Sequence, residues 1–315
     1  MDKKLTRLVL LGAILTMGSP LYPQSQDPSF PNASHIEVRV GNGSFDPQHQ
    51  RPVLYQDDEI TLRLKADGEK LNIVLAKGQV EKSSVVLPQE VAQVDVIRRV
   101  AKSKAVVIGM VNGDVSEVVV LNLYPLRLID KFLAYVPGIS PDGAFVAFIK
   151  FYPPHFVENP TDKYMLYDLR LSASANRPVG VAVSDDVNVG IVVYPTHESN
   201  QDADNTGVPE SEIHRIASEG FFWTPDSKDY LFADEHAGMT SAVFVSVPKN
   251  VGPATCTANI PREELCSHPK TWCGAHLTGV KFKDYGVDAQ FYVTSVGAGL
   301  TKTITLRCEQ FISSH

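Results

Sequence analysis

The chain is built from short apolar runs separated by turn-forming residues, and strong helical periodicity is almost absent. The runs are rich in β-branched residues: HIEVRV, ITLRL, LNIVLA, AVVIGMV, EVVVLNL, FVAFIKF, VGIVVY, AVFVSV, AQFYVTSV and TITLRC. Each is bounded by Gly, Pro, Asn, Asp or Ser. Many short strands with turn signals between them are typical of an all-β sandwich, barrel or propeller. The sequence therefore predicts an all-β fold.

One turn-and-strand segment recurs. ISPDGAFVAF, from Ile139, is repeated in order by WTPDSKDYLFA, from Trp223, and the two prolines are 84 residues apart (225 − 141). That offset is about two propeller blades of 40 to 45 residues. Weaker copies have their turns near residues 66, 101, 185 and 284. The pattern predicts a β-propeller of about six blades, mostly four-stranded antiparallel sheets. Two β-sandwich domains are the alternative, because turn-then-strand motifs recur in sandwiches too.

The chemistry of the repeated turn fits a structural role. Pro141 presets φ at the second turn position, Asp142 can accept local backbone hydrogen bonds, and Gly143 suits the turn exit. Pro225 and Asp226 take the same places in the second copy. The strand that follows Gly143 is apolar on both faces, so we expect it to be covered on both sides.

These residues also carry a resemblance to known proteins. ISPDGAFVAFIKF with the later YMLYDLR, and WTPDSKDYLFAD with the later AVFVSV, resemble the repeats of the six-bladed propeller in the periplasmic Tol-system protein. They are similar also to the propeller domains of prolyl-oligopeptidase-type peptidases. The resemblance implies a propeller fold and no particular activity, since propellers host many unrelated functions. No separate hydrolase domain is expected.

The N-terminal segment has the layout of a secretory signal peptide. Lys3, Lys4 and Arg7 precede an apolar run that ends at Met17, and small residues follow. A membrane anchor is the alternative, but this run falls well short of the roughly 20 residues that a spanning helix needs. We therefore expect a signal peptide over 1–25, a single propeller domain over 26–315, a periplasmic or secreted location, and no stable membrane insertion.

Four cysteines, Cys256, Cys266, Cys273 and Cys308, lie in the last fifth of the chain. In an exported protein they predict two disulfides, with three possible connectivities. A zinc site is the alternative, although its ligands favour closer pairs. The long spacing between the last two repeat turns predicts a disulfide-bound insertion at about 250–275.

The most polar stretch, residues 196–215, is a weak candidate for a metal site. Asp202, Asp204 and Glu210 resemble part of a calcium loop, with Gly207 at the sixth place, yet Ile213 stands where the bidentate Glu belongs. A solvated surface loop is the alternative interpretation. A histidine cluster is another minor possibility, formed by His197, His214 and His236.

Composition and motifs favour binding over catalysis. A formal charge of −7 and a pI near 5.7 give no basic footprint for nucleic acid. No Gly-x-Ser-x-Gly, His-Glu-x-x-His or phosphate-binding loop is present. The leading hypothesis is an exported, non-enzymatic module that binds a protein or glycan through its loops, with no cofactor. A metal-assisted hydrolase or lyase with a site in a central funnel, and a structural or adhesion β-sandwich, are the alternatives.

Overall fold

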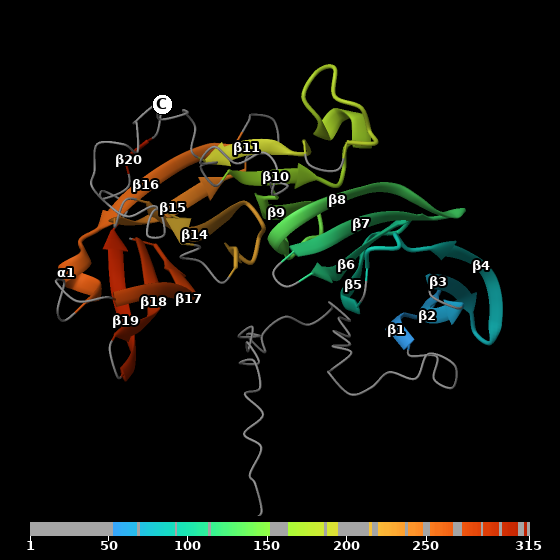
Figure 1. The fold of residues 1–315 in the computed structure, drawn as a ribbon, viewed down its shortest axis with the longest axis horizontal. Helices are drawn as coiled ribbons and strands as arrows, with labels where there is room; N and C mark the ends of the chain where they lie inside the picture. Colours follow the sequence, from blue (N-terminus) through green and yellow to red (C-terminus); the bar gives the residue numbers. More distant parts are fainter. Residues whose placement is uncertain are drawn as a thin grey trace, which may run out of the picture. The chain divides into compact units, whose positions relative to one another are not determined.

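The structure is a computed structural model, shown in Figure 1. It describes residues 53–313 apart from 68–69, 92, 113–114, 152–162, 186–187, 195–213, 216–219, 237–238, 248–252, 267–272, 285, 296–297 and 308–311. The chain divides into two units, residues 1–33 and 34–315, and the described residues all belong to the second. The predicted signal peptide and the run HIEVRV lie outside them.

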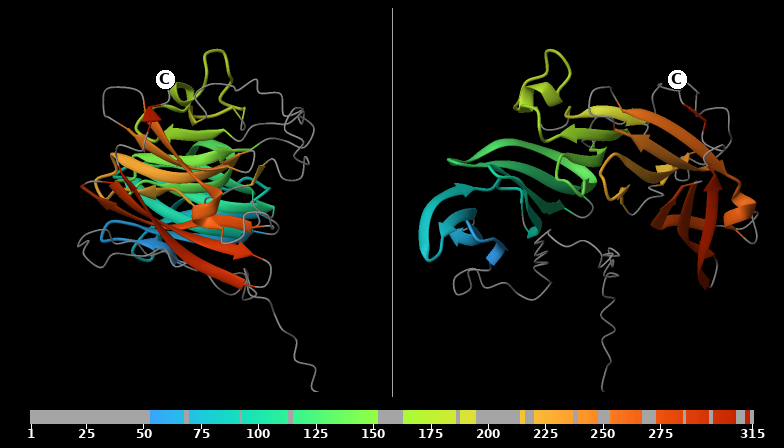
Figure 2. Two further views of the ribbon diagram at one scale, coloured as in Figure 1. Left: turned by 90° about the vertical axis from the view of Figure 1, so that its left-hand side faces the viewer. Right: turned by 180° about the vertical axis from the view of Figure 1, so that it is seen from behind.

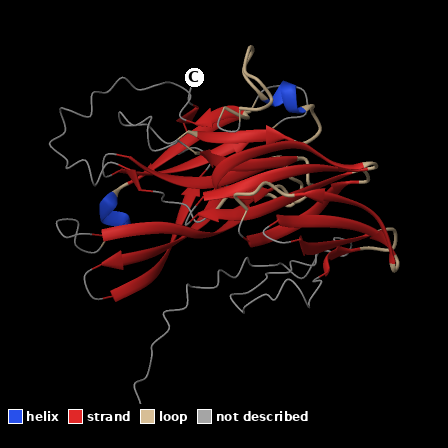
Figure 3. Ribbon diagram, turned by 45° about the vertical axis from the view of Figure 1, so that its right-hand side comes forward, coloured by secondary structure: helices blue, strands red, loops and turns tan. Residues whose placement is uncertain are grey.

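The described residues form four antiparallel sheets and very little helix (Figure 3). The first sheet has the order β1 (Val53–Gln56), β2 (Thr61–Asp67), β3 (Lys70–Lys77) and β4 (Val80–Val86). The second runs from β5 (Gln93–Ala101) through β6 (Lys104–Asn112), β7 (Val115–Leu123), β8 (Leu126–Ile139), β9 (Phe145–Lys150) and β10 (Tyr164–Asp168) to β11 (Ile191–Tyr194). A short 3-10 helix, Ala173–Asn176, follows β10.

The third sheet comprises β12 (His214–Arg215), β14 (Asp229–His236), β15 (Met239–Ser246), β16 (Ala254–Ile260) and β20 (Ile312–Ser313), and β13 (Phe222–Trp223) also pairs with β14. The fourth comprises β17 (Cys273–Lys283), β18 (Gly286–Ser295) and β19 (Ala298–Arg307). The helix α1 (Arg262–Leu265) precedes it. Each sheet is an open path of strands, and the predicted all-β class is confirmed.

Four buried cores separate these strands into five layers. The first sheet packs on one face of β5–β8, and the other face of β5–β8 packs on β9 and β10. The opposite face of β9 and β10 packs on β14 and β15, whose far face packs on β17–β19. Phe145 and Ala147 of β9 enter one core while Val146 and Phe148 enter the next. The expectation that this strand is covered on both faces is confirmed.

Strand β8 belongs to two layers. It is 14 residues long; its first part pairs with β7, whereas pairing with β9 is confined to Ala134–Ile139. The pairing with β9 is irregular between Tyr135 and Gly138, and Val136, which lies between them, has a φ of 47°. This local irregularity allows one continuous sheet of seven strands to supply two layers that pack on each other.

The two repeated turns have the same hydrogen-bond pattern. In the first, the Ser140 hydroxyl donates to Asp142 Oδ1 (2.7 Å) and accepts from the Phe145 N–H (3.0 Å). In the second, Thr224 and Asp226 form the equivalent bond (2.8 Å), and the Asp229 N–H donates to Thr224 Oγ1 (3.1 Å). Pro141 and Pro225 follow the hydroxyl residues. These side chains therefore replace water as partners of the turn backbone.

The two turns also contact each other. The Asp142 N–H donates to the Ser227 hydroxyl at 2.9 Å, although 85 residues separate them. The layers that follow these turns are direct neighbours, because β9 and β10 pack on β14 and β15. The weaker copy of the turn, near residue 185, therefore begins no layer of its own, because the strand that follows it, β11, pairs with β10. Strand β16, which lies within the predicted insertion, pairs with β15 over its whole length.

Candidate functional site

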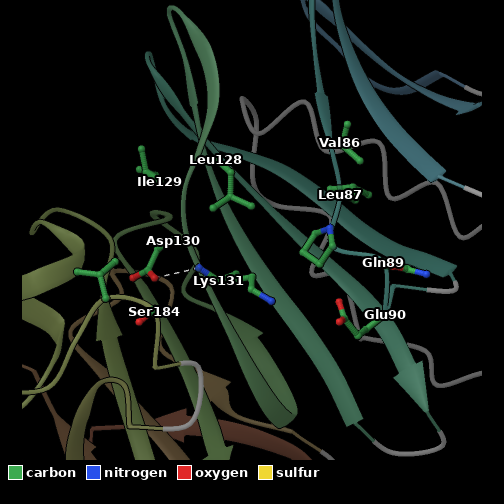
Figure 4. Close-up of a pocket in the computed structure, with 11 residues that line it drawn as sticks. Val86, Leu87, Gln89, Glu90, Leu128, Ile129, Asp130, Lys131 and Ser184 are labelled. Atoms are coloured by element: carbon green, nitrogen blue, oxygen red, sulfur yellow. Dashed lines mark hydrogen bonds between the residues drawn. The ribbon is translucent and has the colours of Figure 1, made fainter.

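An open groove of about 640 Å³ is the candidate binding site (Figure 4). Three segments that are far apart in sequence line it: residues 86–90, which begin at the last residue of β4, residues 128–131 of β8, and Val183 with Ser184 in the loop after β10. Its volume lies in the range of sites that hold small ligands or protein side chains.

The walls of the groove are mostly apolar. Val86 and Leu87 lie across from Leu128, as Figure 4 shows, and Pro88, Ile129 and Val183 also line the groove. Leu87 and Leu128 continue into the core between the first two layers, so the groove walls are anchored in packed structure. The polar side chains that line the groove are those of Gln89, Glu90, Asp130, Lys131 and Ser184.

Asp130, at the base of the groove, is held in a buried polar network. Its two carboxylate oxygens accept bonds from Arg177 at 2.7 and 2.6 Å, and Tyr167 donates its hydroxyl proton to Oδ2 at 2.6 Å. The Lys131 N–H donates to Oδ1 at 2.9 Å. The bond to Asp130 raises the pKa of Arg177, and burial together with Asp130 raises the pKa of Tyr167. With every oxygen of Asp130 occupied twice, this carboxylate has a positioning role.

Through Arg177 the network fixes the loop between β10 and β11, which stands clear of the sheets in Figure 2. Asn176, itself buried, donates to the Asp168 C=O at 2.8 Å and accepts from its N–H at 2.7 Å. Lys150 of β9 donates to Asn188 at 2.9 Å. The loop nevertheless exposes apolar side chains, with Val183 46% exposed and Val179 fully exposed. A firmly held loop with exposed valines is suited to contact a partner.

The charged side chains of the groove differ in whether another side chain of the protein already pairs with them. Lys131 lies 3.2 Å from the buried carboxylate of Glu117, and Asp130 is matched by Arg177. Glu90 is exposed and, among the described residues, has no ion-pair partner. The groove therefore presents one carboxylate beside an apolar floor.

A second hollow, of about 440 Å³, is more polar and surrounds Arg99. Arg99 forms ion pairs with Asp57 and with Glu59, the latter at 2.8 Å. The hydrogen bond from Arg99 lowers the pKa of Glu59. Since these charges are satisfied by one another, the hollow is a weaker candidate than the groove.

Most of the residues predicted as metal ligands lie outside the described part of the chain. Asp202, Asp204, Glu210 and His197 lie outside the described residues, so the calcium interpretation stays a prediction. His214 and His236 occupy opposite positions in the pairing of β12 with β14, although their side chains are not described. Within the described ranges, no group of three or more His, Cys, Asp or Glu side chains could hold a metal ion.

The cysteines differ from the prediction of two disulfides. Cys256 carries a free thiol, and its neighbours across β15 and β20 are Phe244 and Ser313. Cys266 is buried and disulfide-bonded. The side chains of Cys273 and Cys308 lie outside the described residues.

The groove residues were not predicted from the sequence, although the pattern around one of them, Asp130, indicates that it is buried. In the run LRLIDKFLA, Asp130 has the same alternation phase as Phe132 and Ala134, which are fully buried. A charge at an inward position of a strand demands a buried partner. Its partner Arg177 is 47 residues away in a loop, and no local pattern connects the two.

Comparisons with known proteins give structural neighbours only. No family model matches the sequence, and no curated protein matches it. No helix within the described ranges is long and apolar enough to cross a membrane.

Among solved structures, an uncharacterised protein of Listeria monocytogenes matches at 8% identity and a TM-score of 0.33, over 81% of this chain and 66% of that chain. TolB from Agrobacterium tumefaciens matches at 11% identity and 0.26, over 79% and 78%. The β-propeller domain of the Trilobed protease from Pyrococcus furiosus matches at 11% identity and 0.27, over 82% and 85%. These neighbours include a TolB protein and the β-propeller domain of a protease, and at these TM-scores they carry no argument about function.

Proposed function

We propose that this chain is a binding module without catalytic activity, and that it holds a protein partner in the groove between residues 86–90, β8 and the loop after β10. The observation that carries the proposal is the combination of an apolar groove with a loop whose exposed valines are fixed by a buried ion pair. Fixing a contact surface in advance reduces the entropy lost on binding.

The proposal includes export, so that the partner would be met in the periplasm or outside the cell. Support comes from the basic residues and apolar run of the first 25 residues. Mass spectrometry of the purified mature chain tests this part: a mature N-terminus near residue 26 is expected, and an intact Met1 would contradict it.

The binding site is tested by photo-crosslinking in the cells that make the protein. A photo-reactive amino acid at Val183 should give discrete adducts with a partner protein. The same group at Tyr292, which is similarly exposed on β18, is the control and should not give them. Adducts at Val183 should also disappear in a chain that carries Glu90→Lys and Val86→Glu. Identical products at both positions would contradict the proposed site.

A further inference from the structure

The groove is bordered by a strand edge with free backbone groups. Among the described strands, β4 ends the order of the first sheet, so only β3 bonds to it. The Leu87 N–H donates to the Leu71 C=O at 2.8 Å, which continues this ladder. Bonded residues alternate along an antiparallel strand. Ser84 and Val86 therefore direct their N–H and C=O groups away from β3, and Val86 lines the groove.

The other strand at the groove has its edge blocked. The first part of β8 also lacks β9 as a neighbour, but the Lys131 N–H is bonded by Asp130, which Arg177 of the loop holds in turn. On β4, Glu81 and Lys82 are exposed beside an irregularity in the pairing, a common way to protect an edge. Among the described strands that border the groove, only residues 83–87, at the end of β4, remain regular and open.

We infer that the partner binds as an extended strand that adds to this end of β4. Main-chain bonds to Ser84 and Val86 would supply affinity, and alternate side chains of the added strand would enter the groove beside Leu128 and Val183. The inference rests on the proposed function and states the form of its partner.

Charge complementarity narrows the chemistry of that partner. Lys131 and Asp130 are matched within the protein, whereas the Glu90 carboxylate is exposed at the rim. A segment in which β-branched or other apolar residues occupy every second position fits the apolar groove. A Lys or Arg of that segment opposite Glu90 fits the exposed carboxylate. A second copy of this acidic chain fits the charge less well, since its formal net charge is −7.

The test selects random 12-residue peptides displayed on phage against the purified mature chain. Peptides that also bind the Val183→Glu variant are removed, so that those left depend on the groove. Val183 is exposed, so this substitution should not disturb a core. A selected peptide is then synthesised with a single N-methyl group at each backbone position in turn. Strand addition predicts at least tenfold weaker binding at every second position and little change between them. Uniform effects would overturn strand addition while leaving the groove as a binding site.

Variants of the protein give an independent measurement. Val86→Pro removes an outward N–H and spares the bonds to β3, so it should weaken binding at least tenfold, whereas Val86→Thr should bind like the parent. Glu90→Lys should weaken binding more than Glu90→Gln does. Equal binding by both variants would contradict the inference that the partner carries a basic side chain opposite Glu90. Thermal unfolding shows that each variant is folded. The N-methyl series decides the question if Val86→Pro is unfolded.

Two further outcomes separate the inference from the proposed function. If peptides selected without the removal step bind Val183→Glu as well as the parent chain, the proposed groove itself is wrong. If the peptide-free chain is a dimer in solution and Val86→Pro makes it a monomer, a second copy occupies the edge, and the inference of a basic partner is overturned.

Discussion

Two tyrosines with opposite surroundings show how much a buried hydroxyl depends on its partner. Tyr230 is fully buried and its hydroxyl has no hydrogen-bond partner among the described residues, whereas the Tyr167 hydroxyl donates to the Asp130 carboxylate. Removing an unpaired buried hydroxyl relieves its desolvation cost, but removing a bond to a charged group loses about 1.5–3 kcal/mol. Tyr230→Phe should therefore leave stability unchanged or raise it by about 1 kcal/mol, and Tyr167→Phe should lower it. Urea unfolding of both variants measures this, and a large loss in Tyr230→Phe would contradict it.

Asp226 makes stability depend on pH. The hydrogen bonds from Lys228 and Thr224 lower its pKa to about 2, from an ordinary 3.8. Because the folded pKa is the lower one, the stabilisation is present above pH 4 and is lost as the pH falls from about 4 to about 2. The pair is exposed, so Asp226→Asn should cost only about 0.5 kcal/mol at pH 7. Unfolding curves between pH 7 and pH 2 should show this difference shrinking below pH 4, and a difference that grows in acid would contradict the assignment.

At the scale of elements, the repeated turn is restricted by its neighbour as well as by its own backbone. Gly143 has a φ of 71°, and a Cβ there would lie 3.0 Å from Val100 of β5. Gly180 has a φ of 88° but no atom near its Cβ position. Gly143→Ala should therefore cost about 1–3 kcal/mol, and more than Gly180→Ala, which adds only backbone strain. Thermal unfolding of both variants checks the order, and equal losses would mean that the contact with Val100 is unimportant.

The strands could be predicted from the sequence, but their neighbours could not. Alternation in FVAFIK indicated a strand covered on both faces, and the Pro-Asp turns marked where strands begin, since both are local properties. The 84-residue offset suggested an intervening blade, yet the repeated turns are directly bonded through Ser227. Sequence distance does not encode which layers touch. The groove was out of reach for the same reason, because residues 86–90, β8 and Val183 meet only after folding.

At the scale of the whole described structure, stability should vary from layer to layer. The layers of β5–β8, of β9 and β10, and of β14–β16 each contribute to two cores, whereas β1–β4 and β17–β19 each contribute to one. Layers covered on both faces should open least often. Native-state hydrogen exchange should show the slowest amides in β9, β10, β14 and β15, and faster exchange in β2 and β19. Equal protection in all layers would contradict this ranking.

The sharing of β8 between two layers limits which changes in chain length the protein can tolerate. An insertion or deletion of one residue in a hairpin loop shifts only that loop, but the same change near Lys131 would move every later β8 side chain to the other face of the strand. Asp130 would then no longer share a face with Phe132 and Ala134, and the pairing of Ala134–Ile139 with β9 would shift as well. The spacing between the residues of Leu126–Ile139 must therefore stay fixed.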